Sequence, residues 1–145
     1  MTPKFQVHLK IRKPVTEVFA AVVDAQKLSS YFVRTASGPL AAGATVEWSF
    51  VEAPRPIPVH VREVDPDARI IFEWPAAGGY ETCVEMEFVP LDGANTMVKI
   101  SEHGWREDAE GVKGSYDNAG GWMHMLCCLK ARLEYDINLR AGGAF

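Results

Sequence analysis

The sequence has little that would attach it to a nucleic acid or a membrane. Its 15 lysine and arginine residues are outnumbered by 19 aspartate and glutamate residues, which gives a net charge of −4 and no excess of positive charge to bind phosphates. No apolar run reaches the roughly 18 residues of a membrane-spanning helix. The first residues alternate in polarity and lack the apolar core of a secretory signal. We therefore expect no nucleic-acid partner and no membrane insertion.

Cysteine is also scarce. Three cysteines are present, and two of them are neighbours, an odd set that does not suit a disulfide framework. This usage is typical of a reduced, cytoplasmic protein. With 145 residues, of which 48% are hydrophobic and 23% charged, the chain is expected to form one domain over residues 1–145 with a substantial core. Composition leaves open whether it is a monomer or a homodimer.

Common catalytic and nucleotide-binding motifs are missing: there is no P-loop, no GxGxxG, no HExxH and no GxSxG. The nearest approach to a metal site is His124 with Cys127 and Cys128. Adjacent helical residues lie about 100° apart, so both thiols cannot face one metal ion. A further ligand, Cys83 or His103, has no supporting spacing. We expect no metal and no cofactor, and cysteines that pack as small hydrophobic side chains.

The sequence does contain clear changes of periodicity. Residues 4–13 alternate as a half-buried strand does. Residues 15–32 carry apolar side chains at helical spacing after Pro14, which favours two short helices. After a loop at residues 37–44, five alternating runs separated by short turns predict an antiparallel meander. These runs cover residues 45–52, 57–64, 69–74, 80–89 and 96–105.

A long amphipathic helix is predicted to close the chain. It begins between residues 109 and 116 and ends near Asn138. Its apolar stripe consists of Trp122, Leu126, Leu129, Leu133 and Ile137, bordered by Met125. The element order predicts an α+β fold in which a curved, six-stranded antiparallel sheet wraps around this helix, with room for a cavity between them.

Two segments resemble a known superfamily. "VTEVFAAVVDAQKLSSYF" (15–32) is similar to the opening motif of the START-like, or SRPBCC, superfamily, and residues 103–134 are similar to its closing motif. The best match is the branch named for the activator of heat-shock-protein ATPase, although Tyr31 stands where tryptophan is usual. The resemblance implies the helix-grip fold of the birch-pollen allergen and suggests a chaperone as one partner. The motifs mark fold more than function.

Inward-facing aromatic residues are the clearest indication of function. Aromatic walls with a few polar groups are typical of small-molecule pockets, although core packing would explain any single ring. We expect an unidentified small apolar or amphipathic ligand between sheet and helix. The candidate ligand-binding residues are Tyr31, Phe32, Trp48, Phe50, Phe72, Trp74, Tyr80, Glu102, Trp122, Met125, Leu126 and Leu129.

Two glutamates fall on inward positions by period 2. Glu102 follows Ile100, and Glu52 follows Phe50, each near a strand end. An inward carboxylate could orient a polar head group or act as a general base. The commoner outcome is a surface glutamate on a strand end that has reached solvent, and we expect it for both. For His103, at the corner between strand and helix, we expect a structural role.

Three functions stay open. Ligand binding requires only a pocket with apolar walls and is the interpretation we favour. An enzyme of the cyclase, dehydratase or hydrolase kind would need convergent polar groups around a cavity acid such as Glu102 or His103. A protein-interaction module similar to the chaperone activator would need an exposed surface, for which the strand face with Glu81, Glu85 and Glu87 is a candidate.

Overall fold

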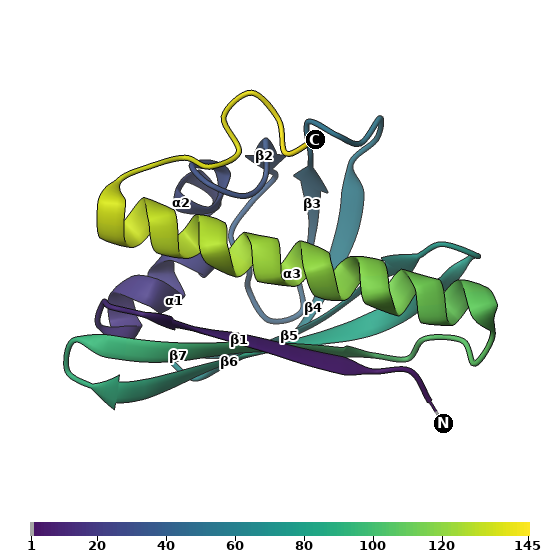
Figure 1. The fold of residues 1–145 in the computed structure, drawn as a ribbon, viewed down its shortest axis with the longest axis horizontal. Helices are drawn as coiled ribbons and strands as arrows, with labels where there is room; N and C mark the ends of the chain where they lie inside the picture. Colours follow the sequence, from purple (N-terminus) through teal and green to yellow (C-terminus); the bar gives the residue numbers. More distant parts are fainter. Residues whose placement is uncertain (1) are drawn as a thin grey trace.

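The computed structural model describes residues 2–145 and shows a long helix packed on one face of an antiparallel sheet (Figure 1). The elements are β1 (Phe5–Ile11), α1 (Val15–Val23), α2 (Ala25–Ser29), β2 (Thr35–Ala36), β3 (Thr45–Ser49), β4 (Ile57–Asp65), β5 (Arg69–Ala76), β6 (Tyr80–Asp92), β7 (Asn95–His103) and α3 (Ala109–Tyr135). The strand order is β1-β7-β6-β5-β4-β3-β2, and every pairing is antiparallel. The predicted helix-grip architecture, with two short helices after the first strand, is confirmed.

Two details of the prediction are wrong. The sheet has seven strands, because Thr35 and Ala36 pair with the end of β3. A two-residue strand is too short to produce a readable alternation. The helix α3 ends at Tyr135, three residues before the predicted end near Asn138, because Asp136 adopts a left-handed conformation (φ 55°) that stops it.

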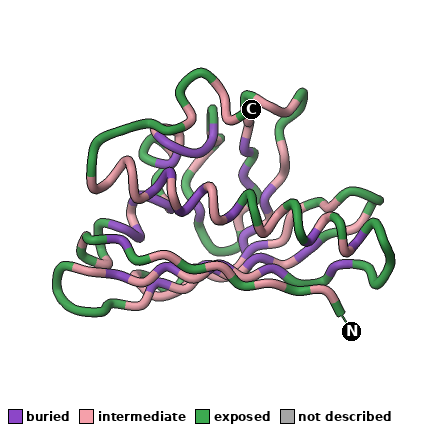
Figure 2. The backbone as a smooth tube through the Cα atoms, in the orientation of Figure 1, coloured by how far each residue is buried: buried purple, intermediate pink, exposed green. Residues whose placement is uncertain are grey.

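The alternation seen in the sequence decides which side chains are buried. β6 buries Thr82, Val84, Met86 and Phe88 and leaves the residues between them half-buried. β7 behaves in the same way. Figure 2 shows buried residues recurring along the strands and along α3, separated by half-buried and exposed residues. In Figure 1 the sheet bends, so that β2 and β3 rise beside α3 while β1, β7 and β6 run beneath it.

Both ends of α3 are attached to the rest of the fold. At its start, Asp108 accepts a hydrogen bond from the Gly111 N–H (2.8 Å), and a Cβ at Gly111 would lie 1.9 Å from the Arg106 carbonyl oxygen. Near its end, Glu134 accepts hydrogen bonds from the backbone and guanidinium of Arg12 and from Lys130. Burial raises the pKa of Glu134, but these hydrogen bonds outweigh burial and lower the pKa to about 2.

Within residues 2–145, no helix combines the length and the apolar character that crossing a bilayer requires.

Candidate functional site

A cavity of about 260 Å³ lies between α3 and the bent part of the sheet. Its walls come from five parts of the chain: the segment after α2, the loop after β3, β5, α3 and the segment after α3. The lining residues are Phe32, Phe50, Glu52, Ala53, Trp74, Asn118, Gly121, Trp122, His124, Arg140, Ala144 and Phe145. Gly121 and Phe145 are exposed, so the cavity reaches the surface.

Four aromatic rings form a continuous wall of this cavity. Phe32 is central, with its ring centroid 5.2 Å from that of Phe50 and 5.8 Å from that of Trp122. Trp74 lies 5.2 Å from Trp122 in a tilted stack. These separations fall in the range of favourable aromatic pairs, so the wall is a packed surface of fixed shape.

Behind this wall lies a buried carboxylate. Glu102 is 0% exposed, and the expectation that it had reached solvent is wrong. Its oxygens accept hydrogen bonds from the indole N–H of Trp74 (3.0 Å), the indole N–H of Trp122 (2.9 Å), the hydroxyl of Thr82 (2.6 Å) and the amide of Asn118 (3.1 Å). A carboxylate that is shielded from solvent needs such donors, because burying an unpaired charge has a large free-energy cost.

Strand register explains how these partners meet. Trp74 is paired with Thr82 across β5 and β6, and Val84 is paired with Glu102 across β6 and β7, so the inward faces of three neighbouring strands converge. From the opposite side, Asn118 and Trp122 lie one turn apart on α3 and face the sheet together. Glu102 therefore joins the sheet to the helix.

Two of these partners, Thr82 and Asn118, were not among the predicted site residues. Thr82 occupies an inward position of the alternating run 80–89, but alternation by itself assigns no role to such a residue. Asn118 lies four residues before Trp122, and extending the apolar stripe of the helix by one turn would have identified it. The polar character of Asn118 hides it from a search for apolar periodicity.

A second carboxylate lies at the cavity mouth. Glu52 forms an ion pair with Arg140, and its side chain is 12% exposed, so the expectation of a solvated strand-end glutamate is wrong here too. Glu52 also accepts a hydrogen bond from the Ala144 N–H (3.3 Å). The guanidinium carbon of Arg140 lies 5.8 Å from the ring centroid of Phe32 and 5.9 Å from that of Phe50. The segment after α3 thus folds over the cavity. Its turn-like sequence has no periodicity from which this role could be predicted.

The structure divides the candidate ligand-binding residues into three groups. Phe32, Phe50, Trp74 and Trp122 line the cavity, with Glu102 directly behind them. A second group is buried in the core away from the cavity lining: Tyr31, Trp48, Phe72, Met125, Leu126 and Leu129. Tyr80 lies elsewhere, where its hydroxyl accepts a hydrogen bond from the Arg106 N–H (3.3 Å) and its ring packs under the Arg106 guanidinium.

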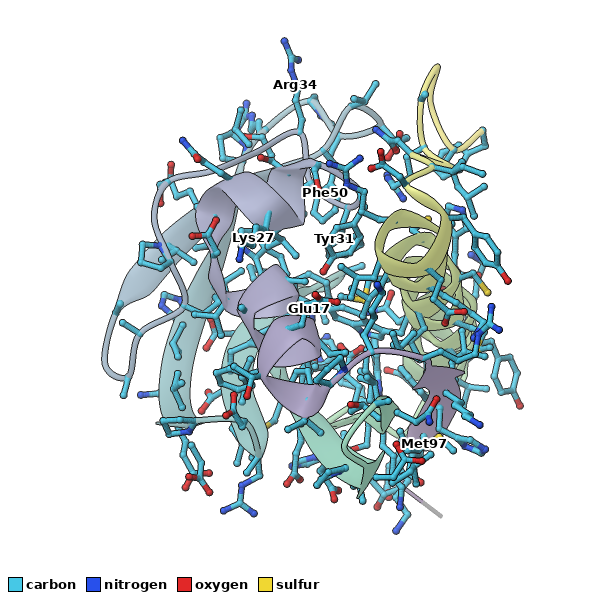
Figure 3. All side chains as sticks on the ribbon, turned by 90° about the vertical axis from the view of Figure 1, so that its left-hand side faces the viewer. Glu17, Lys27, Tyr31, Arg34, Phe50 and Met97 are labelled. Atoms are coloured by element: carbon cyan, nitrogen blue, oxygen red, sulfur yellow. The ribbon has the colours of Figure 1, made fainter. Side chains whose placement is uncertain are left out.

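Figure 3 views the molecule from the side on which the short helices α1 and α2 lie. Tyr31 and Phe50 lie between these helices and α3, whereas Arg34 points away into solvent. Glu17, Lys27 and Tyr31 belong to a different hollow, of about 430 Å³, between the short helices and the end of α3. Most of the residues that line that hollow are charged or polar, and Tyr31 is the one aromatic residue among them, so it lacks the aromatic wall of the first cavity.

The histidine and cysteine candidates do not converge. His103 is the exposed last residue of β7. The Cys128 sulfur lies 3.5 Å from His124 Nε2, and burial raises the pKa of the Cys128 thiol, which disfavours the thiolate. Within residues 2–145, no three potential metal-ligating side chains are grouped together. All three cysteines are free thiols.

The acidic strand face is partly neutralised. Glu85 lies 3.6 Å from Arg69, and Glu81 lies 3.0 Å from the His60 ring, which offsets its charge only when the ring is protonated. Glu87 is the cross-strand neighbour of Lys99. The face carries mixed charge, as solvated sheet faces commonly do.

Comparison with known proteins agrees with this fold. Residues 12–134 match the family described as Activator of Hsp90 ATPase homolog 1-like protein. No curated protein is similar enough to this chain to count as a match. Protein SSP2350 from Staphylococcus saprophyticus is 24% identical, with a TM-score of 0.81 over 95% of this chain and 96% of that one.

Two further solved structures share the fold. DynU16, a protein in the dynemicin biosynthetic locus, is 24% identical, with a TM-score of 0.80 over 92% of this chain and 48% of that one. The Aha1 dimer from Colwellia psychrerythraea is 16% identical, with a TM-score of 0.77 over 92% of this chain and 97% of that one. At these identities the likeness extends to the fold alone.

Proposed function

The chain belongs to the Activator of Hsp90 ATPase homolog 1-like family, and from this premise we propose that it binds a small amphipathic molecule in the cavity between the sheet and α3. The observation that carries the proposal is the continuous aromatic wall with two polar groups, Glu52 and Arg140, at its mouth. An apolar cavity of about 150 Å³ accommodates benzene, so about 260 Å³ suits a fused aromatic ring or one ring with a short head group.

We assign Glu102 a positioning role in this function. Both of its oxygens already accept hydrogen bonds, and the side chain has no exposed surface from which to take a proton from a ligand. What Glu102 does instead is hold the indoles of Trp74 and Trp122 in one orientation. For this reason an enzyme that uses Glu102 as its cavity acid is less well supported than a binding protein.

The relatives are compatible with ligand binding and with a second candidate function. DynU16 is a protein in the dynemicin biosynthetic locus, which is compatible with small-molecule binding by this fold. The family name and the Aha1 dimer support an interaction with a chaperone, either as a monomer or as a homodimer. The mixed charge of the face around Glu81 and Glu85 makes that surface a weak candidate for docking. We place the protein in the cytoplasm, where its free thiols would stay reduced.

A pair of glycine variants tests the proposal. Gly121 lines the cavity and Gly120 does not, and a Cβ at either position meets no atom within 4 Å. We expect Gly121→Phe to fill the cavity mouth, while Gly120→Phe places the same ring outside it. The probe is 2-naphthylmethanol, a neutral amphipathic aromatic molecule.

The expected result is a ligand-dependent rise in melting temperature. A probe at 100 times its Kd stabilises the folded state by about 2.7 kcal/mol. For a domain of this size that amounts to roughly 5–10 °C. The rise should appear in the wild type and in Gly120→Phe but not in Gly121→Phe. Equal shifts in all three proteins, or a shift in none of them, would contradict binding in this cavity.

A further inference from the structure

We propose that the cavity selects an organic cation, an ammonium or guanidinium carried on an aromatic or aliphatic body, and that Arg140 occupies the cation position until such a ligand displaces it. The inference rests on the proposed binding function and names its ligand class. It starts from the placement of the Arg140 guanidinium, which lies over two aromatic rings, 5.8 and 5.9 Å from their centroids, and pairs with one carboxylate. This is the environment that a cation prefers when it leaves water.

The groups around the cavity favour positive charge. Glu52 supplies a carboxylate at the mouth, and among the described lining residues the basic side chains are Arg140 and His124. The indole N–H groups of Trp74 and Trp122 both donate to Glu102, so the positive ring edges point to that carboxylate. Donation to an anion enriches the ring faces in electron density, which strengthens their attraction for a cation.

The segment that carries Arg140 is held by few contacts. Beyond α3, Ile137 is 51% exposed, Leu139 49% exposed and Phe145 fully exposed, so the segment buries little apolar surface. Its polar contacts with the cavity wall run through Glu52, which pairs with Arg140 and accepts a hydrogen bond from the Ala144 N–H. The Arg140 guanidinium also lies over the rings of Phe32 and Phe50. In Figure 1 this segment, in yellow, crosses from the end of α3 to the neighbourhood of β2 and β3. A segment with so few buried contacts opens at low cost.

These observations define a competition. With Arg140 in place, the charge of Glu52 is neutralised inside the protein. When the segment lifts, the same carboxylate and the same ring faces are free for the head group of a ligand. The apparent affinity for a cation is therefore reduced by the fraction of molecules in which Arg140 occupies the position. Removing the guanidinium should raise the affinity for cations in particular.

The test uses three probes that share one ring system: (2-naphthylmethyl)trimethylammonium, neutral 2-naphthylmethanol and anionic 2-naphthylacetate. Binding is followed by NMR of the indole N–H signals of the chain's 4 tryptophans. Trp74 and Trp122 line the cavity and report on it, whereas Trp105, which does not line it, serves as an internal reference. The proteins compared are the wild type, Arg140→Gln and Glu52→Gln.

We expect the cation to bind the wild type more tightly than the other probes. Arg140→Gln should lower the Kd for the cation about tenfold and change the Kd for the neutral probe much less. Glu52→Gln should remove the preference for the cation. Two variants control for the loss of charge alone: Arg132→Gln, at an arginine paired with Asp136 outside the cavity, and Glu47→Gln, on the exposed side of β3. Neither variant should change the order of affinities for the three probes.

The outcomes separate the two proposals. If the neutral probe binds at the cavity indoles but the cation binds no better in any variant, the cation inference fails and the binding function stands. If the anion binds best in the wild type and Arg140→Gln abolishes its binding, Arg140 is a ligand-binding residue and the inference is overturned. If no probe changes the chemical shift of the Trp74 or Trp122 indole N–H in any of the proteins, both proposals fail.

Discussion

Replacing Glu102 with glutamine tests the buried carboxylate that joins the sheet to α3. Glutamine keeps the shape but supplies one acceptor oxygen in place of two. Whichever way its amide turns, the NH₂ group faces the indole N–H of either Trp74 or Trp122. The Thr82 hydroxyl can rotate to accept, but an indole N–H cannot. One buried donor therefore loses its acceptor.

The expected cost follows from that single lost partner. An unsatisfied buried donor costs about 1–3 kcal/mol, and part of this is offset because a neutral amide is cheaper to bury than a carboxylate. We expect Glu102→Gln to lower the free energy of unfolding by about 2 kcal/mol. For a chain of this length that corresponds to a melting temperature lower by roughly 4–8 °C.

Urea unfolding followed by tryptophan fluorescence measures this change, with a constant m-value as the sign that the same structure unfolds. Glu47→Gln is the matched control, because Glu47 lies on the exposed side of β3 and should shift stability by no more than about 0.5 kcal/mol. If Glu102→Gln proves as stable as the wild type, the donors do not depend on the carboxylate, and the account of Glu102 as the link between sheet and helix is refuted.

Two further predictions concern α3. Gly111→Ala should destabilise the protein by about 3 kcal/mol in thermal or urea unfolding, because the new Cβ would lie 1.9 Å from a backbone carbonyl oxygen. Glu134→Gln should lower stability by roughly 1–2 kcal/mol at pH 7. Since folding lowers the pKa of Glu134 to about 2, its contribution is fully present above about pH 4.5 and is lost as the pH falls toward 2, so variant and wild type should converge there.

Each of these changes has a control on the same helix. Gly120→Ala introduces a Cβ that meets no atom within 4 Å and should stabilise the helix by about 0.5–1 kcal/mol. Asp117→Asn removes an exposed pair with Lys113 and should change stability by less than about 1 kcal/mol at any pH. A Gly111→Ala protein as stable as Gly120→Ala, or a Glu134→Gln difference that persists at pH 2, would contradict the reasoning.

The sequence by itself determined the element order, the antiparallel pairing and the inward faces of the strands. These features depend on the spacing of residues that are close together in the chain. Period 2 placed Thr82 and Glu102 inward, and period 3.6 placed Trp122 against the sheet, as the structure confirms. The same local patterns could not reveal β2, which has two residues and no period.

Only the tertiary structure decided what the inward polar residues do. Whether Glu102 ends in solvent or in a ring of donors depends on the register of three strands and on where α3 crosses them. Likewise, the pairing of Glu52 with Arg140 joins residues 88 positions apart through a segment with no periodicity of its own. Periodicity assigns a side chain to a face, but its partners on that face come from distant parts of the chain, and their convergence is a property of the packed fold.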